Sequence, residues 1–230
     1  MRINQELTGA HVFSCGKNMG VFKAVGYPED VGEFYRLEEY EGYAWTAHGR
    51  YPTNTPGWWG GAHPFSILDY SVVHNGEISS YDANRRFIEM YGYNCSLLTD
   101  TEGITYIIDF LVRRKGLTLE EAAGVIAAPF WSTIEQMPEA QRERLAYLRE
   151  TFASLLITGP FSILLGFTGG MMALNDRLKL RSMVCAEKGE AVYFASEECA
   201  IRVMEPDVET LWAPRGGQAV VVRLNDGVTV

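Results

Sequence analysis

The chain has 230 residues, 47% of them apolar, so it can bury a hydrophobic core as a single domain over residues 1–230. Its 20 basic and 29 acidic side chains give a formal charge of -9 without a basic run, which disfavours nucleic acid as a partner. It has no stretch of about 18 apolar residues and no secretory signal at its start, which predicts a cytoplasmic protein outside the membrane.

The opening of the chain favours β structure. From residue 10 to residue 26 short apolar runs alternate with glycine and lysine, which predicts a hairpin of half-buried strands. Residues 43–48 again have a strand pattern. Residues 51–57 contain two prolines, which cannot donate to a ladder, so this stretch is predicted to be a loop.

The middle of the chain changes to a helical period. A short strand over residues 69–73 leads into His74-Asn75-Gly76, and helices follow at about 81–91 and from Thr99 to about 115. The second of these ends in two arginines, a lysine and a glycine, which suit a helix C-terminus. Further helices are predicted over residues 119–128 and 139–151.

The last third returns to strands, predicted at 161–167, 171–174, 184, 192–195, 201–204 and 219–224. The order strands, helices, strands favours sheets with helices gathered on their outer faces over a strictly alternating parallel fold. The four cysteines, Cys15, Cys95, Cys185 and Cys199, contain no C-x-x-C pair, so we expect reduced and mostly buried thiols.

Three short polar blocks carry the candidate chemistry, and the first is His48-Gly49-Arg50-Tyr51-Pro52-Thr53-Asn54. A guanidinium matches a carboxylate with two parallel hydrogen bonds, so the natural ligand of Arg50 is a carboxylate or a phosphate. An ion pair with a surface carboxylate is the commoner explanation of such an arginine. This block does not decide the function by itself.

The second block is Val72-Val73-His74-Asn75-Gly76-Glu77-Ile78. Asn-Gly after a strand is first of all a hairpin signal, because both residues tolerate positive φ. The alternative is that the amide of Asn75 and the N–H of Gly76 form a donor pair for one oxygen, which stabilises a tetrahedral oxyanion. A helix predicted soon after Gly76 leaves no adjacent partner strand, which weakens the hairpin interpretation.

The third block is Leu97-Leu98-Thr99-Asp100-Thr101-Glu102. Thr99 and Glu102 fit a capping box, and Asp100 in the first turn complements the helix dipole. Asp100 is also well placed to bind a substrate ammonium. Together the blocks offer a cation for a carboxylate, an anion for an ammonium and donors for a carbonyl oxygen, and glutamine fits that set.

In this order and with these spacings, the three blocks resemble the signature of class II glutamine amidotransferases. The Thr53-Asn54-Thr55-Pro56 extension and the Trp58-Trp59 loop before Gly60-Gly61-Ala62-His63-Pro64-Phe65 are most similar to the stand-alone glutaminase domain of archaeal-type glutamate synthases. Later turns, including Asn175-Asp176-Arg177 and Ala195-Ser196-Glu197, carry the resemblance to the C-terminus.

The resemblance implies the α+β fold of N-terminal-nucleophile hydrolases, a four-layer αββα sandwich with two mainly antiparallel sheets. It also implies roles for individual residues. Arg50 and Thr53 would bind the substrate, with Arg50 on the α-carboxylate; Asp100 would hold the amino group, and Asn75 and Gly76 would form the oxyanion hole. The domain itself would need no cofactor.

The family's nucleophile is a cysteine at residue one whose own α-amino group is the base. Here residue one is Met1, followed by Arg2, and the only early thiol is Cys15, inside the predicted hairpin. We therefore expect an N-terminally incomplete domain that lacks the strand carrying the nucleophile and is inactive by itself.

Two functions remain open from the sequence. In the first, the chain hydrolyses L-glutamine and passes ammonia to a glutamate synthase subunit or domain that holds FMN and an iron-sulfur cluster. In the second, it is a catalytically silent glutamine-binding or scaffolding module. A metal hydrolase using His48, His63 and His74 is a weaker third idea, because their spacing matches no common zinc pattern.

Overall fold

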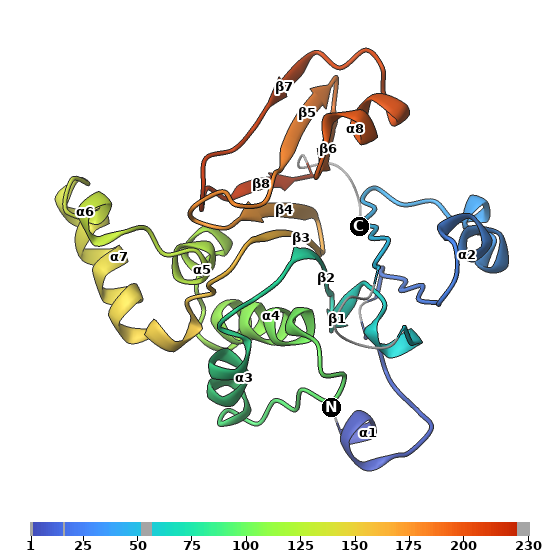
Figure 1. Cartoon of the computed structure of the whole chain (residues 1–230), viewed down its shortest axis with the longest axis horizontal. Coiled ribbons are helices and arrows are strands. Elements are labelled where there is room, and N and C mark those ends of the chain that lie inside the picture. Colours follow the sequence, from blue (N-terminus) through green and yellow to red (C-terminus); the bar gives the residue numbers. More distant parts are fainter. Residues whose placement is uncertain (1, 16, 52–56, 225–230) are drawn as a thin grey trace.

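The computed structural model describes residues 2–15, 17–51 and 57–224. Two antiparallel sheets lie face to face, and helices cover the outer face of the larger one (Figure 1). The larger sheet has the order β1-β2-β3-β4-β8 and the smaller one β6-β5-β7. The strands are β1 Phe65–Ile67, β2 Tyr70–Gly76, β3 Phe161–Phe167, β4 Gly170–Asn175, β5 Val184–Lys188, β6 Ala191–Ala195, β7 Thr210–Trp212 and β8 Val220–Arg223.

The α-helices are α1 Arg2–Glu6, α2 Pro28–Tyr35, α3 Tyr81–Glu89, α4 Asp100–Asp109, α5 Leu119–Ile126, α6 Trp131–Ile134, α7 Glu139–Thr151 and α8 Glu198–Met204. A wide π-helical turn, η3 Phe110–Arg114, continues α4, and short 3₁₀ turns occur at η1 Leu37–Glu39, η2 Trp59–Gly61 and η4 Ala153–Leu155. Within the described ranges, none of the helices combines the length and apolar character that a bilayer span needs.

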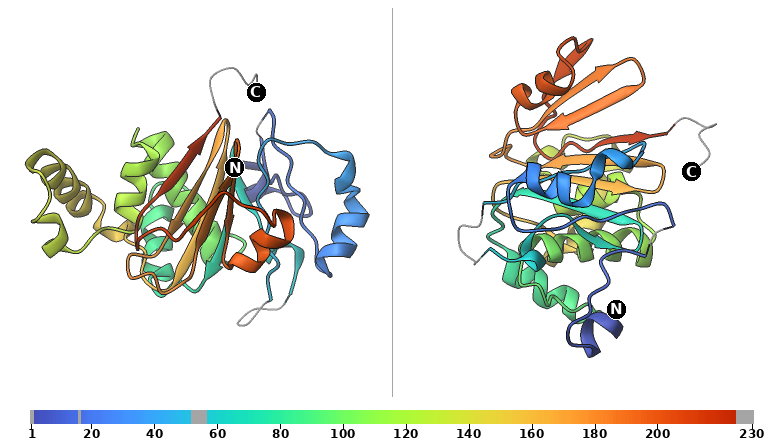
Figure 2. Two further views of the ribbon diagram at one scale, coloured as in Figure 1. Left: turned by 90° about the horizontal axis from the view of Figure 1, so that it is seen from above. Right: turned by 90° about the vertical axis from the view of Figure 1, so that its right-hand side faces the viewer.

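The main core lies between the larger sheet and the helices. Helix α4 packs against β1 and β2, and its apolar residues join those of β3 and β4 in one buried cluster. A smaller cluster around Ala173, Met183 and Cys185 fills the space between the two sheets. With the short helix α8 packed against β6, the layers confirm the expected αββα arrangement of two antiparallel sheets (Figure 2).

Strand β2 contacts both the helices and the smaller sheet, because successive side chains of a strand point to opposite faces. Val72 belongs to the helix-side cluster, and His74 on the same face reaches Thr101 in α4. Asn75 points the other way and bonds Ser196, at the end of β6. The strand is fixed in register by β3, with Asn75 opposite Ser162 and Gly76 opposite Phe161.

Most elements from residue 69 onward match the sequence predictions, including 139–151 as α7 and 161–167 as β3. The prediction of a strand at 201–204 is wrong, since these residues end helix α8. Only Ile201 of that segment is buried, while Val203 is 85% exposed, so its β-branched residues do not form one buried face.

The predicted strands at 10–26 and 43–48 are also wrong: in the described ranges the first strand is β1 at Phe65. A strand needs a partner, and side chains satisfy the backbone here instead. The Asn4 amide donates to Val12 O at 2.9 Å and accepts from Val12 N at 2.7 Å. The Tyr35 hydroxyl donates to Lys23 O at 2.8 Å. The predicted loop 51–57 lies mostly outside the described residues.

Candidate active site

The C-terminal end of β2 carries the first part of the site, Asn75 and Gly76. The Asn75 amide donates one N–H to Ser196 Oγ at 3.0 Å, and an amide has a second N–H to offer. Glu77 N donates to Pro160 O at 3.0 Å. Because consecutive N–H groups of a strand point to opposite edges, the Gly76 N–H points away from β3, past the end of β1.

Gly76 is required by a close approach of two backbones. A Cβ at this position would lie 2.0 Å from Pro160 O, and its φ of 156° is one that other residues rarely adopt. The hairpin interpretation of Asn75-Gly76 is therefore wrong, since both residues lie in β2 and pair with β3.

Asp100 is the first residue of helix α4, which packs against β2. Its Oδ2 accepts a hydrogen bond from Ile78 N at 3.2 Å, which ties the carboxylate to the segment after Gly76. Burial raises the pKa of the Asp100 carboxyl, but the imidazole of His74 and the N–H groups of Ile78 and Thr101 outweigh it. The pKa lies below its usual value, so Asp100 is an anion suited to an ammonium group.

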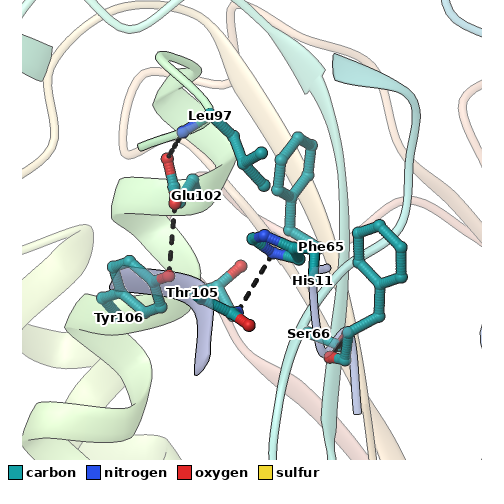
Figure 3. Close-up of a pocket in the computed structure, with 9 residues that line it drawn as sticks. His11, Phe65, Ser66, Leu97, Glu102, Thr105 and Tyr106 are labelled. Carbon is teal, nitrogen blue, oxygen red and sulfur yellow. Dashed lines mark hydrogen bonds between the residues drawn. The ribbon is translucent and has the colours of Figure 1, made fainter. Parts of the chain in front are cut away.

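The capping box predicted for this helix is only half present. Thr99 Oγ1 accepts from Glu102 N at 3.2 Å, but the Glu102 carboxylate accepts from Leu97 N at 2.8 Å and Ser96 N at 3.1 Å. Glu102 lines a small cavity with Tyr106 (Figure 3). Burial raises the pKa of Glu102 to about 7, although the hydrogen bonds from Leu97, Tyr106 and Ser96 and the charge of Lys23 oppose the rise.

Arg50 is held by the short turn η2. Its Nη1 donates to Gly61 O at 2.8 Å, and Lys23 Nζ donates to the preceding carbonyl, Gly60 O, at 3.3 Å. A Cβ on Gly61 would lie 2.7 Å from the same Nη1, so the glycine allows the guanidinium to approach. Arg50 lines a broad groove between residues 17–51 and the turn that joins β3 to β4. Thr53, also predicted to bind substrate, lies outside the described residues.

A buried polar network joins Asp100 to two histidines through Thr101. The Thr101 hydroxyl lies 3.0 Å from His63 Nε2, 3.3 Å from His74 Nδ1 and 3.3 Å from Asp100 Oδ1. One hydroxyl donates once, so it donates to Asp100 and accepts from both imidazoles. The other ring nitrogens, His63 Nδ1 and His74 Nε2, are buried and lack a hydrogen-bond partner within the described residues.

Two of these imidazoles are neutral near pH 7. The rings of His48 and His63 lie 4.2 Å apart between centroids. Burial lowers the pKa of His48 to about 4, and the proximity of His74 and Arg50 adds to the fall. Burial, reinforced by the proximity of His48, His74, Arg50 and Lys23, lowers the pKa of His63 to about 2.

The histidines of the metal hypothesis lie close together, but they are not arranged as a metal site among the described residues. The structure does bring His48 to His63, and His63 and His74 to one hydroxyl. In the part of the chain that is described, however, no three His, Cys, Asp or Glu residues are arranged to hold a metal ion.

The cysteines differ in their surroundings. Cys95 and Cys185 are buried, and burial raises the pKa of each thiol to about 12. Cys15 is exposed, and its N–H donates to Leu68 O, before the first residue of β2 and at the opposite end of that strand from Asn75. Cys199 is exposed on α8, beside Glu197.

The structure thus gathers Asn75, Gly76 and Asp100 around one end of β2, and Arg50 lies close enough to His48 and His63 to lower their pKa values. Sequence reasoning missed Thr101 and Ser196, which make the connecting contacts, and considered His63 and His74 only as metal ligands. For His74 the signal was present, because it lies inside the second polar block, whereas His63 lies outside all three blocks. Nothing in the sequence brings Ser196, 121 positions away, to Asn75.

Comparison with known proteins decides the family. Residues 2–230 match the family model described as "Glutamine amidotransferases class-II". The chain belongs to the class II glutamine amidotransferases.

Two curated relatives cover nearly the whole of this amidotransferase chain. An uncharacterized protein of Archaeoglobus fulgidus is 51% identical over 97% of the chain and 60% of its own length. A glutamine amidotransferase-like protein of Rhizobium meliloti is 28% identical over 88% of the chain and 59% of its own length. The chain therefore spans about 60% of the length of these relatives.

The search of solved structures finds the glutamine phosphoribosylpyrophosphate amidotransferase of B. subtilis, with a TM-score of 0.46 and 18% identity. That match covers 67% of this chain and 27% of the other. The values are too low to transfer any detail of that enzyme to this amidotransferase.

Proposed function

We propose that this domain hydrolyses L-glutamine to glutamate and ammonia at the end of β2. The observation that carries the proposal is that the Asp100 carboxylate is bonded to the segment directly after the Asn75-Gly76 donor pair, in a chain of this family. Asp100 binds the α-ammonium, while Arg50 and Thr53 bind the substrate at its carboxylate end. The side-chain carbonyl then lies against Asn75 and the Gly76 N–H.

In the reaction, a thiolate attacks the side-chain carbonyl carbon of glutamine and places negative charge on the carbonyl oxygen. Donors that are already in position stabilise this charge without reorganising, which is the role proposed for Asn75 and Gly76. The proton that the thiol gave up passes to the leaving nitrogen, so collapse of the tetrahedral intermediate releases ammonia and leaves a thioester, which water hydrolyses to glutamate and the free thiol.

We propose that the attacking thiol is an N-terminal cysteine supplied from outside these 230 residues. The burial of Cys95 and Cys185, and the position of Cys15 at the opposite end of β2, support this assignment. Cys199 is the remaining alternative, since it lies three residues after Ser196, the partner of Asn75.

Ammonia release from glutamine by the purified chain tests these assignments. We expect no turnover by the chain alone, and turnover once a cysteine-bearing N-terminal segment is supplied. A glutamine-like diazoketone should then label that cysteine, as shown by peptide mapping. Labelling of Cys15 or Cys199 that Cys15→Ser or Cys199→Ser abolishes together with turnover would instead place the nucleophile inside the chain.

For the acceptor, we propose a glutamate synthase subunit or domain with FMN and an iron-sulfur cluster, acting in the cytoplasm. The Thr53-Asn54-Thr55-Pro56 extension and the Trp58-Trp59 loop support this choice. The test is glutamate formation from glutamine and 2-oxoglutarate by the domain and a candidate synthase, compared with the same synthase given free ammonia. Equal rates with and without the domain would contradict it.

The alternative is a silent glutamine-binding module. Calorimetry separates the two functions, because a silent module binds glutamine but releases no ammonia even when the cysteine-bearing segment is supplied.

A further inference from the structure

The side chain of Asn75 is connected to the smaller sheet through one hydroxyl. Its Nδ2 lies 3.0 Å from Ser196 Oγ, although the two residues are 121 positions apart. Ser196 directly follows β6 and is half-buried.

Ser196 belongs to a closed circuit of hydrogen bonds between the two sheets. Ser162 Oγ donates to Ser182 O at 2.9 Å, and Ser182 Oγ donates to Ser196 O at 2.7 Å. Ser162 stands directly opposite Asn75 in the β2–β3 ladder, which closes the circuit. The backbone at Ser196 is therefore fixed independently of the contact that its hydroxyl makes.

An oxyanion donor must be oriented before the reaction. The terminal torsion of an asparagine side chain is soft, so an amide without a fixed partner samples many orientations. Catalysis benefits only from donors that already point to where charge develops. A partner that engages one N–H of the amide fixes the direction of the other.

We propose that Ser196 is a positioning residue for Asn75: its hydroxyl accepts one N–H of the amide and leaves the second aimed at the substrate oxygen. This role rests on the proposed glutaminase function. Ser196 touches Asn75 and not the reacting atoms, so its loss affects the transition state more than the binding of glutamine.

Ser182 provides the matched control. Ser182→Ala removes the 2.7 Å bond to Ser196 O and weakens the circuit, but it leaves the Asn75–Ser196 contact intact. If Ser196 only joins the sheets, the two alanine variants behave alike. If Ser196 orients the amide, only Ser196→Ala affects Asn75, and Ser196→Thr, which keeps the hydroxyl, restores the wild-type behaviour.

The first test reads the amide directly and needs no turnover. In the chain labelled with ¹⁵N-asparagine, the side-chain NH₂ of Asn75 is identified by its loss in Asn75→Asp. We expect two well-separated proton signals, with at least one protected from exchange, in the wild type, Ser182→Ala and Ser196→Thr. In Ser196→Ala the protection should be lost. An unchanged Asn75 signal in Ser196→Ala overturns the proposal.

The second test is kinetic and uses the protein with its cysteine-bearing segment. Losing one neutral hydrogen bond that orients the donor should lower kcat about tenfold in Ser196→Ala, with KM unchanged. In an Asn75→Ala background the same substitution should have no further effect. An equal loss in Ser182→Ala, or an unchanged kcat in Ser196→Ala, contradicts the proposal. A lack of turnover in every form contradicts the glutaminase function instead, and the NMR result still decides the role of Ser196.

Discussion

The region before Phe65 and the region after it are built in different ways. From Phe65 onward, two sheets and their helices enclose all the buried apolar side chains that form the core of the described residues. In residues 2–15 and 17–51 the regular elements are helical, and aromatic side chains remain exposed, among them Tyr27 at 72% and Phe34 at 77%. Side chains such as Asn4 bond the backbone there in place of a ladder.

The proposed site takes groups from both regions. Asn75 and Asp100 are set by a strand and a helix that are packed on the core. Arg50 lies in the region before Phe65 and donates to the carbonyl of Gly61. The chemistry of the oxyanion thus depends on the rigid region, whereas recognition of the carboxylate depends on how the other region is docked.

The largest effect on turnover should come from Asn75, in the region from Phe65 onward. Asn75→Ala removes a donor used mainly in the transition state, so kcat should fall by about two to three orders of magnitude with little change in KM. Steady-state ammonia release measures both constants. Asn94→Ala, at an exposed position, is the control and should match the wild type. A loss of stability without the fall in kcat would leave Asn75 only a structural role.

Arg50→Ala and Asp100→Ala should act on KM instead. Each removes a charge-assisted contact, with an expected loss of roughly 1.5 to 3 kcal/mol in glutamine binding. Arg36→Ala and Asp82→Ala, which remove exposed charges paired with Glu39 and Arg85, are the matched controls. The assignment fails if KM for glutamine stays the same in both site variants.

The free energy of unfolding should depend on pH, because His63, which contacts Thr101, and its neighbour His48 are buried. His48 and His63 are held neutral in the fold, whereas in the unfolded chain they bind protons below about pH 6.5. The free energy of unfolding should therefore fall as pH drops from 6.5 toward 4. His63→Gln, which can still donate to Thr101, should reduce that slope by at most about 1.4 kcal/mol per pH unit. Urea titrations at pH 6.5, 5.5 and 4.5 measure it, and parallel curves for variant and wild type would contradict the expectation.

The smallest effect lies within the core region. Asn175 is fully buried, and among the described residues neither of its amide atoms has a partner. Asn175→Leu should therefore raise the free energy of unfolding by about 1 kcal/mol. Asn84 is equally buried but donates to Ser154 O and Leu156 O, so Asn84→Leu should destabilise. Chemical denaturation of both variants tests the contrast, which fails if Asn175→Leu also destabilises.

The local sequence pattern predicted an element correctly where the packing of the folded chain agrees with that pattern. The charged helix over Glu139–Thr151 and the buried strand Phe161–Phe167 were predicted with their bounds. The same reasoning failed at 10–26 and 43–48, because a strand pattern describes what a segment could pair with and says nothing of whether a partner is present. It failed at 201–204 because a strand would bury both Ile201 and Val203, whereas helix α8 buries Ile201 alone.

The site was predicted by residue type and not by connection. A capping box explained Glu102, but its carboxylate reaches past Thr99 to Leu97 and Ser96. The interpretation of Asn75-Gly76 as a turn followed from short-range propensity, whereas the long-range pairing with Ser162 and Phe161 decides their conformation. Contacts such as Thr101 with two imidazoles depend on the docking of separate elements, which no local pattern encodes.

Because successive side chains of β2 point to opposite faces, the site depends on the register of this strand. His74 serves the helix side and Asn75 the sheet side, so a shift of one residue exchanges the two environments. A single deletion in β2 before His74 would turn the imidazole to the face of the smaller sheet and the Asn75 amide to the face of α4, so both contacts would be lost together. An insertion at the exposed turn residue Leu68, before β2, leaves the register with β3 in place and spares both.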